Sequence, residues 1–275
     1  MLSRMAFRMT VLASGSKGNS TVVSSSGASI LVDAGLSCRE TLKRMQQAGE
    51  DPGSLVAIVV SHEHSDHVGG LYHLAKKLKL PVYITVATHA AYRRGCGNSE
   101  GVHFDLERAE HFEAGRSFRI ADIAVTPFTI PHDAADPVGF VFSIDGMKVA
   151  IVTDLGYMPA SVREHLRGCA GLMIESNHDV EMLRGGSYPW SVKQRVMSRV
   201  GHLSNAALAE FFAHDYDGGA QFLVLAHLSE ENNHPEIARQ CAGQALEARR
   251  SLFDNLFENR IMLASQSQVL EPIRL

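Results

Sequence analysis

Short apolar runs separated by Gly, Ser, Asn and Asp recur along the chain, and this pattern is typical of β-strands joined by turns. The run at 55–60 is apolar throughout, which indicates a strand buried on both faces. An Asp145-Gly146 pair between two such runs predicts a tight hairpin turn, and Ala121-Asp122 lies between the strands of a second hairpin. We predict strands over residues 9–13, 21–24, 28–32, 55–60, 81–84, 118–120, 123–130, 138–144, 148–152, 172–175 and 222–226.

Helices are predicted where turn residues are followed by longer segments that contain both apolar and polar residues. Ser37 is a suitable N-cap for a helix reaching about Ala48, with Glu40 at the capping-box position and Gly49 ending it. Further helices are predicted at 71–78, 205–213 and 234–252, and another carries Lys193. The chain shows no internal repeat and no linker, so we expect residues 1–275 to form a single domain.

The segment Ser61-His62-Glu63-His64-Ser65-Asp66-His67 directly follows the buried run at 55–60. His62 and His64 are two residues apart, so on an extended chain both side chains point the same way. Asp66 and His67 follow as the chain turns toward a Gly-Gly pair. A polar turn rich in His by chance is the alternative, but turn propensity does not favour His. Imidazole with carboxylate indicates a transition-metal site, with room for two ions.

Three later strands also end in a possible ligand: 124–130 runs into His132, 149–153 into Asp154, and 223–226 into His227. Any one of these alone would more readily be an ordinary polar residue at a strand end. Their common position after an apolar run is what makes them candidates.

Composition narrows the class of protein. The net charge of −4 excludes a globally basic nucleic-acid binder, although a local basic groove remains possible. The four Cys are scattered without a CxxC pair, which favours free thiols in a reducing compartment. Because no segment has the length and apolarity of a membrane span and no signal peptide is apparent, we expect a cytoplasmic protein without membrane association.

The His run resembles the HxHxDH signature of the metallo-β-lactamase superfamily, together with its preceding strand and following Gly-Gly turn. The resemblance implies an α/β fold, an αββα four-layer sandwich, with the metal site along one edge. It implies that one metal is bound by His62, His64 and His132, and the other by Asp66, His67 and His227. Asp154 would bridge the two ions, and Asp33 would support the His run through hydrogen bonds, although a simple turn residue is the alternative for Asp33.

The implied ligand set leaves a net positive charge when two divalent ions are bound, which suits an anionic substrate. Two such ions lower the pKa of a bridging water and clamp a phosphoryl group during in-line attack. Zn²⁺ is the first choice of metal. Mn²⁺ is the second, because carboxylates are present and no thiolate is.

Further strings resemble the YycJ/WalJ branch of the superfamily, a group described as 5′-to-3′ DNA exonucleases. They are GSKGNS at 15–20, ESNHD at 175–179, GHLSN at 201–205 and HLSEENNHP at 227–235. A similarity to ribonuclease Z implies that Glu175 pairs with His202, which then donates a proton to the leaving oxygen. A His that packs locally at a helix N-terminus is the alternative for His202. We predict that Asp66, together with Glu175 and His202, is a catalytic residue. His178 is either a supporting residue or part of the surface.

The loop 15–20 can present backbone N–H groups to an anion, and Ser16, Lys17 and Asn19 are candidate phosphate contacts. A flexible turn is an equally good interpretation. The β-CASP nucleases of the superfamily carry an extra domain between the positions that correspond to Asp154 and His227. The stretch between these two residues is too short here for such a domain, so any nucleic-acid surface must be small. Candidates for that surface are Arg184, Lys193, Arg195, Arg199, Tyr188 and Trp190, with a solvated helix face or core cover as the alternative.

The leading hypothesis is therefore a dinuclear metal-dependent phosphodiesterase, a nuclease acting on DNA more than on RNA. A hydrolase of a small thioester or lactone on the same fold is the main alternative. A flavodiiron-like redox protein is disfavoured because that group places Glu at the position of His64. A non-catalytic module is disfavoured by the complete ligand set. The final stretch, 259–275, carries no motif.

Overall fold

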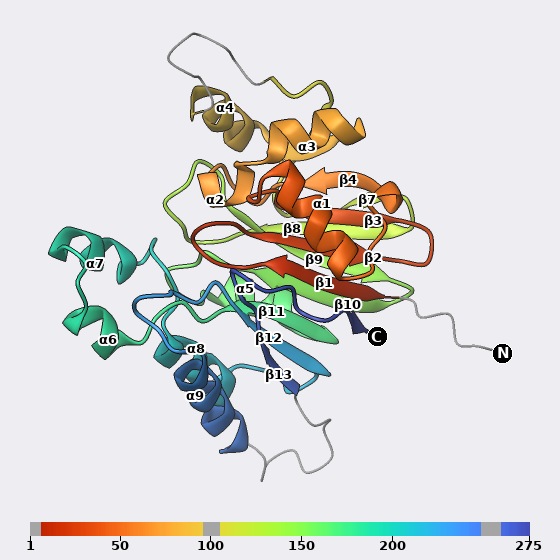
Figure 1. Cartoon of the computed structure of the whole chain (residues 1–275). Coiled ribbons are helices and arrows are strands. Elements are labelled where there is room, and N and C mark those ends of the chain that lie inside the picture. The colour runs from red at the N-terminus through yellow and green to blue at the C-terminus, as the bar shows by residue number, and fades with distance from the viewer. Residues whose placement is uncertain (1–6, 96–104, 249–259) are drawn as a thin grey trace.

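The structure, a computed structural model, describes residues 7–95, 105–248 and 260–275. It consists of two seven-stranded sheets packed face to face, with helices on both outer sides (Figure 1). Each sheet is mixed, with antiparallel pairs on one side and parallel pairs on the other. The predicted αββα four-layer sandwich is therefore confirmed.

The first sheet comprises, in spatial order, β14 (Ile273–Arg274), β1 (Arg8–Ala13), β2 (Ser20–Ser24), β3 (Ser29–Val32), β4 (Leu55–Val59), β5 (Val82–Thr85) and β6 (Ala109–Phe112). The second comprises β13 (Arg260–Leu263), β12 (Phe222–Ala226), β11 (Gly171–Glu175), β10 (Met147–Val152), β9 (Val138–Ile144), β8 (Ile123–Thr129) and β7 (Phe118–Ile120). Both predicted hairpins, β7–β8 and β9–β10, are present with the expected antiparallel pairing.

The helices of the first half are α1 (Cys38–Gln47), α2 (Ser65–Val68), α3 (Leu71–Leu78) and α4 (Val86–Gly95), with a 3-10 turn at Pro52–Ser54. Those of the second half are α5 (Ala160–Leu166), α6 (Val180–Gly185), α7 (Trp190–Val196), α8 (Asn205–His214) and α9 (Pro235–Glu247). The Ser37 hydroxyl accepts a hydrogen bond from the Glu40 amide, as an N-cap should. The Glu40 carboxylate pairs with Arg44, so only half of the predicted capping box is formed.

Three apolar layers explain why many strands read as continuous apolar runs. Ile30 and Val59 point into the layer between the sheets, whereas their neighbours Leu31 and Ile58 point toward α1 and α3. In the second sheet Ile151 faces the other sheet, and Ala150 packs in the layer shared with α5, α8 and α9. A strand that is covered on both faces loses the alternation of apolar and polar residues.

Several elements were not predicted from the sequence: β6, β13, β14, α2, α4, α5 and α6. The segment after Asn259, in which no motif was found, supplies an edge strand to each sheet. These strands are short and lie at sheet edges, where burial imposes little pattern on the sequence. The predicted helix at 234–252 is confirmed to Glu247, and residues 249–252 lie outside the described residues.

One edge of the sandwich gathers the ends of the strands that carry the candidate site. Strands β3 and β4 run parallel in the first sheet, and β10, β11 and β12 run parallel in the second. The carboxyl ends of parallel strands meet at the same edge of a sheet. Within the described ranges, no helix is long and apolar enough to cross a membrane.

Candidate metal centre

Three strand-end residues of the site have left-handed backbone conformations. Asp33 after β3, Asp154 after β10 and His227 after β12 have φ angles of 58°, 62° and 55°. Such conformations cost of the order of 1–3 kcal/mol for residues other than Gly, and they persist only where the surroundings enforce them. All three side chains take part in the candidate site: Asp154 and His227 lie in its clusters, and Asp33 contacts His67. This strain was not foreseen from the sequence.

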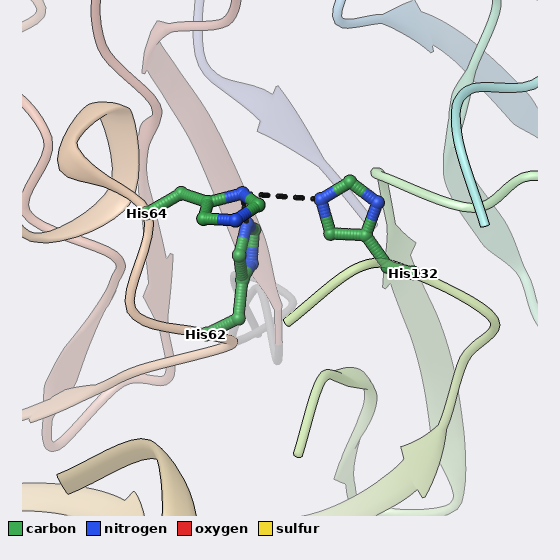
Figure 2. Close-up of side chains that lie close together, drawn as sticks. All are labelled: His62, His64 and His132. Carbon is green, nitrogen blue, oxygen red and sulfur yellow. Dashed lines mark hydrogen bonds between the residues drawn. The ribbon is translucent and has the colours of Figure 1, made fainter. Parts of the chain in front are cut away.

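The first cluster consists of His62, His64 and His132 (Figure 2). The Nδ1 atom of His64 lies 3.2 Å from Nε2 of His62 and 3.2 Å from Nε2 of His132. Burial, and then the charge of neighbouring imidazoles, hold the pKa of His62 well below its usual range. Burial likewise lowers the pKa of His132. Neutral imidazoles whose ring nitrogens converge are the form that binds a metal ion.

The second cluster consists of Asp66, His67, Asp154 and His227, whose ligand atoms lie within 4.8 Å of one another. Nε2 of His67 is 3.2 Å from Asp154 Oδ2 and 3.4 Å from Asp66 Oδ2, and Nε2 of His227 is 3.5 Å from Asp66 Oδ2. The Asp154 Oδ2 and His227 Nε2 atoms are buried without a hydrogen-bond partner. Unpartnered buried polar atoms on neighbouring metal-ligand candidates fit a bound cation.

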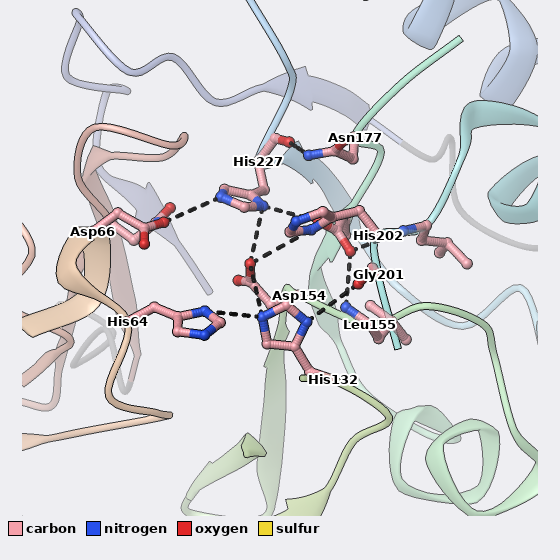
Figure 3. Close-up of polar contacts among 12 residues, drawn as sticks. His64, Asp66, His132, Asp154, Leu155, Asn177, Gly201, His202 and His227 are labelled. Atoms are coloured by element: carbon pink, nitrogen blue, oxygen red, sulfur yellow. Dashed lines mark hydrogen bonds and ion pairs between the residues drawn. The ribbon is translucent and has the colours of Figure 1, made fainter. Parts of the chain in front are cut away.

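Asp154 lies between the two clusters and is 2% exposed (Figure 3). Its Oδ1 atom is 4.0 Å from His132 Nε2 in the first cluster, whereas its Oδ2 atom faces His67 in the second. The Oδ1 atom also lies 3.3 Å from Nδ1 of His227, so this carboxylate contacts members of both clusters, as a bridging ligand would.

The electrostatics of the second cluster require positive charge. Burial alone would lower the pKa of His227, but the nearby carboxylates of Asp154, Asp66 and Glu175 outweigh it and raise this pKa to about 10. Buried carboxylates are costly without a compensating cation. Metal ions at this edge would supply that compensation.

Asp33 supports the His run. Its Oδ1 accepts a hydrogen bond from the Ser61 amide at 2.8 Å, and its Oδ2 lies 2.8 Å from Nδ1 of His67. A carboxylate on Nδ1 orients the ring and leaves Nε2 to face the second cluster. The structure therefore places Asp33 where a supporting residue was expected, rather than only in a turn.

Glu175, at the end of β11, is fully buried and accepts four hydrogen bonds. Its Oε2 accepts from the amides of Leu155 at 2.9 Å and Leu203 at 3.1 Å. Its Oε1 lies 2.9 Å from Nδ1 of both His202 and His227. Burial would raise the pKa of Glu175, but the two imidazoles outweigh it and lower this pKa to about 2.

His202 shares a potential metal-binding group with Asp154, Glu175 and His227. Because Nδ1 of His227 is within hydrogen-bonding distance of Glu175, its Nε2 remains for the second cluster, and we interpret the Glu175 contacts as a hydrogen-bond network. Burial would lower the pKa of His202, but Glu175 outweighs it and the pKa is raised. The His202 side chain is 21% exposed, so the ring can reach a substrate.

Gly201 makes this placement of His202 possible. A Cβ atom at Gly201 would lie 2.2 Å from the carbonyl oxygens of Arg195 and Val196, so no larger residue fits. The Gly201 carbonyl also lies 3.2 Å from Nδ1 of His132. The GHLSN string thus connects α7 both to His202 and to His132 of the first cluster.

Asn19, in the 15–20 loop, does not have the environment expected of a phosphate contact. Asn19 is buried, and its Nδ2 donates to Asp66 Oδ2 at 3.1 Å and lies 2.9 Å from Nε2 of His67. Its amide therefore holds metal-ligand candidates rather than facing a phosphate. Ser16 and Lys17 are exposed, and the Lys17 ammonium pairs with Glu230 at 2.6 Å.

The basic residues proposed for nucleic-acid binding are not equivalent. Lys193 is buried, and its ammonium donates to the carbonyls of Arg184 and Gly186 at 2.8 and 2.6 Å, so it is a structural residue and not a solvated phosphate contact. Arg195 pairs with Asp133, a contact that the sequence did not suggest. Arg199 lies over the ring of Tyr157, 4.2 Å from its centroid.

The structure also shows the environments of His178 and of the two candidate aromatic residues, Tyr188 and Trp190. His178 is buried rather than on the surface, and its Nδ1 lies 3.3 Å from Asn177 Oδ1. Tyr188 is half-buried, whereas Trp190 is 61% exposed and does not cover the core.

Comparisons with known proteins agree with this geometry. A family model described as the beta-lactamase superfamily domain matches residues 28–228. The exodeoxyribonuclease YycJ of Bacillus anthracis is 40% identical over 245 residues, which cover 89% of this chain and 91% of that protein. The exodeoxyribonuclease WalJ of Streptococcus pneumoniae is 37% identical over 238 residues, covering 86% and 87%.

Among solved structures, the metallo-β-lactamase fold protein YhfI from Bacillus subtilis has a TM-score of 0.69 at 18% identity, covering 96% of this chain and 99% of YhfI. A likeness at this identity shows the fold. The family model and the two relatives show more: this chain belongs to the metallo-β-lactamase superfamily.

Proposed function

We propose that this protein is a dinuclear metal-dependent exodeoxyribonuclease that degrades DNA from a free end in the 5′-to-3′ direction. Relatives at 40% and 37% identity carry the name exodeoxyribonuclease, and they align along most of both chains. The observation that carries the proposal is the pair of His/Asp clusters joined by Asp154 and flanked by the Glu175–His202 pair.

Seven side chains would hold the two ions. His62, His64 and His132 would bind the first, Asp66, His67 and His227 would bind the second, and Asp154 would bridge them. The imidazole and carboxylate donors favour Zn²⁺, with Mn²⁺ as the second choice. When bound, two such ions activate water at neutral pH and stabilise charge on a phosphoryl group.

The chain itself would supply the proton for the leaving oxygen. Nδ1 of His202 donates to Glu175, so the second ring nitrogen carries the transferable proton when the imidazole is protonated. The raised pKa of His202 favours that form near neutral pH. Glu175 is held by two backbone amides, so it fixes the ring while remaining ionised.

Asp66 has a double role in this proposal. Its side chain is 18% exposed, whereas the other members of the second cluster are nearly fully buried. It would therefore bind metal and face the substrate at the same time. Ser16 and Lys17 remain candidates for phosphate contacts on the exposed rim, and Lys17 would exchange Glu230 for a phosphate.

We also propose that both sheets act as one domain, because each contributes residues to the site. The thiols of Cys38, Cys169 and Cys241 are free, which is in keeping with a cytoplasmic location.

The test is an assay of Zn²⁺- and Mn²⁺-loaded protein on end-labelled linear DNA, closed circular DNA and RNA of the same sequence. A thioester, a lactone and bis(p-nitrophenyl) phosphate serve as small substrates. We expect mononucleotide release from linear DNA and no cleavage of the circle. Efficient hydrolysis of the thioester or lactone, with linear DNA untouched at low salt, would replace the nuclease by the small-substrate hydrolase.

A further inference from the structure

Exposed apolar side chains are concentrated on α7, on the segment that joins it to His202, and on Tyr157, which Arg199 covers. Among the described residues, the large hydrophobic side chains that are exposed include Trp190 at 61%, Val200 at 45%, Val192 at 38% and Tyr157 at 36%. Outside this region they include Val56 and Val86. Clustered exposed apolar groups of this kind usually mark a binding surface.

Helix α7 carries Trp190 and Val192, and with α6 it lies outside the sandwich (Figure 1). Its far end is tied directly to the site, because Val196 O accepts from the His202 amide at 2.9 Å. A helix rises about 1.5 Å per residue, so Trp190 lies about 9 Å along the axis from Val196. That span corresponds to roughly two or three stacked nucleotides at ~3.4 Å each.

The helix is held firmly in this position. The Lys193 ammonium is bonded to the carbonyls of Arg184 and Gly186, which fixes α7 against the end of α6. Nε of Arg195 donates to Asp133 Oδ2 at 2.5 Å, and Asp133 follows His132 of the first cluster. Trp190 is therefore exposed on a helix whose distance from the metal centre is set by buried and charged contacts.

The charge of this segment is opposite to that of the chain. Residues 182–201 contain Arg184, Lys193, Arg195 and Arg199 and no Asp or Glu, in a chain of net charge −4. Lys193 is buried, and Arg184 and Arg195 pair with Glu181 and Asp133, so among the described residues Arg199 is the cation of this segment that is left to meet a phosphate. Arg199 stacks on Tyr157, which leaves a flat cation–aromatic face next to Val200. Aromatic faces combined with cations suit bases and phosphates of a single strand, because every base offers a π-face.

We infer that this α7 surface, formed by Trp190 at the start of the helix and by Arg199, Val200 and Tyr157 beyond its end, binds the unpaired nucleotides at a DNA end, with a base stacked on Trp190. The inference rests on the proposed function and deepens it, because it makes single-stranded DNA, or a duplex with an unpaired end, the substrate that enters the site. A protein partner on the same apolar face is the competing occupant, and the experiment distinguishes the two.

Trp190 is the single tryptophan of the chain, so the intrinsic fluorescence of the protein reports on this surface alone. Metal-loaded His202→Ala protein, which should keep its oligonucleotide intact, is titrated with a single-stranded oligonucleotide, a blunt duplex and an abasic strand. We expect the single strand to quench the emission, and the abasic strand to bind with little quenching. Unchanged emission at saturating single strand, measured by a separate anisotropy signal, would overturn the stacking role.

The matched variants are Trp190→Ala, Trp190→Phe and Val86→Ala, the last altering a residue that is 64% exposed on α4. Removing the aromatic face should weaken single-strand binding roughly 5- to 100-fold, and Phe should restore most of it. For Trp190→Ala, the loss in kcat/KM should be at least about ten-fold greater on single-stranded DNA than on bis(p-nitrophenyl) phosphate. Val86→Ala should behave as wild type in each measurement.

Three outcomes separate the possibilities. Wild-type protein that neither binds nor cleaves DNA would reject the proposed function itself. Normal DNA cleavage with equal affinity in wild type and Trp190→Ala would reject only the inference about α7. A concentration-dependent self-association in sedimentation that Trp190→Ala abolishes, together with unchanged DNA binding, would assign the surface to a protein contact and also reject the inference.

Discussion

The Oε1 atom of Glu175 lies 2.9 Å from the Nδ1 atom of His202, and the carboxylate is fully buried while the imidazole reaches the surface of the site. Both backbone amides that bond the other oxygen of Glu175 come from residues beside the site, Leu155 after Asp154 and Leu203 after His202. The carboxylate therefore fixes the orientation of the ring and favours its protonated form.

Replacing His202 by Ala should slow DNA cleavage by roughly two to four orders of magnitude, the usual range for a lost general acid, while metal content stays unchanged. The defect should shrink on bis(p-nitrophenyl) phosphate, whose leaving group needs no proton. His214→Ala, an exposed histidine of α8, is the matched control. Steady-state rates on both substrates check this, and equal losses on the two would leave His202 only a positioning role.

Replacing Glu175 by Gln should shift the alkaline side of the pH–rate profile to lower pH. Activity requires protonated His202, so it declines as pH rises through the pKa of His202. Glu175 raises that pKa, and its neutral substitute removes the effect, so the decline begins earlier. The profile of kcat/KM on linear DNA measures the shift. A profile that keeps its alkaline side in the variant would show that another group sets the decline.

Replacing Asp154 by Ala should remove the bridge between the two clusters. We expect at least one of two ions to be lost per chain, with most of the activity, while far-UV circular dichroism stays close to wild type. Asp51→Ala, at an exposed turn remote from the site, should keep both ions. Elemental analysis provides the count, and fully active wild-type protein with a single stable ion would contradict the dinuclear assignment.

Replacing Lys193 by Met should lower the free energy of unfolding rather than alter only DNA binding. The substitution removes both hydrogen bonds to the carbonyls of Arg184 and Gly186, and unpaired buried acceptors cost about 1–3 kcal/mol. Lys77→Met, on the exposed face of α3, is the matched control and should change stability by less than about 0.5 kcal/mol. Urea unfolding of both variants decides the matter, and equal stabilities would show that Lys193 has no structural role.

Replacing His178 by Gln should make the protein less sensitive to acid. Burial lowers the pKa of His178 to about 4, so the folded state binds its proton less readily than the unfolded state does. The associated stability is present above the unfolded pKa of about 6.5 and is lost as pH falls toward 4. Between pH 7 and 5.5 the wild type should lose about 1 kcal/mol that the variant retains. Chelator-treated proteins should be compared by urea unfolding, and identical pH dependences would contradict the prediction.

Much of the fold and of the candidate metal centre could be predicted from the sequence because both follow from local sequence patterns. The apolar runs predicted most strands of the central layers, and Asp145-Gly146 predicted the β9–β10 turn. His62, His64, His132, Asp154 and His227 could be named as candidate ligands because each follows such a run, and the structure brings them together at one edge. A strand that ends in a ligand is a local pattern, and it survives folding because parallel strands end at a common edge.

The tertiary structure decided what depends on contacts between distant segments. Nothing local distinguishes Asn19, whose amide reaches Asp66 and His67, from a turn residue facing solvent. Lys193 has the sequence surroundings of an exposed cation, yet the end of α6 buries its ammonium. Trp190 could equally have covered the core or faced solvent. These outcomes depend on which backbone carbonyls and side chains the packed sheets and helices bring within hydrogen-bonding distance, and a local pattern does not contain that information.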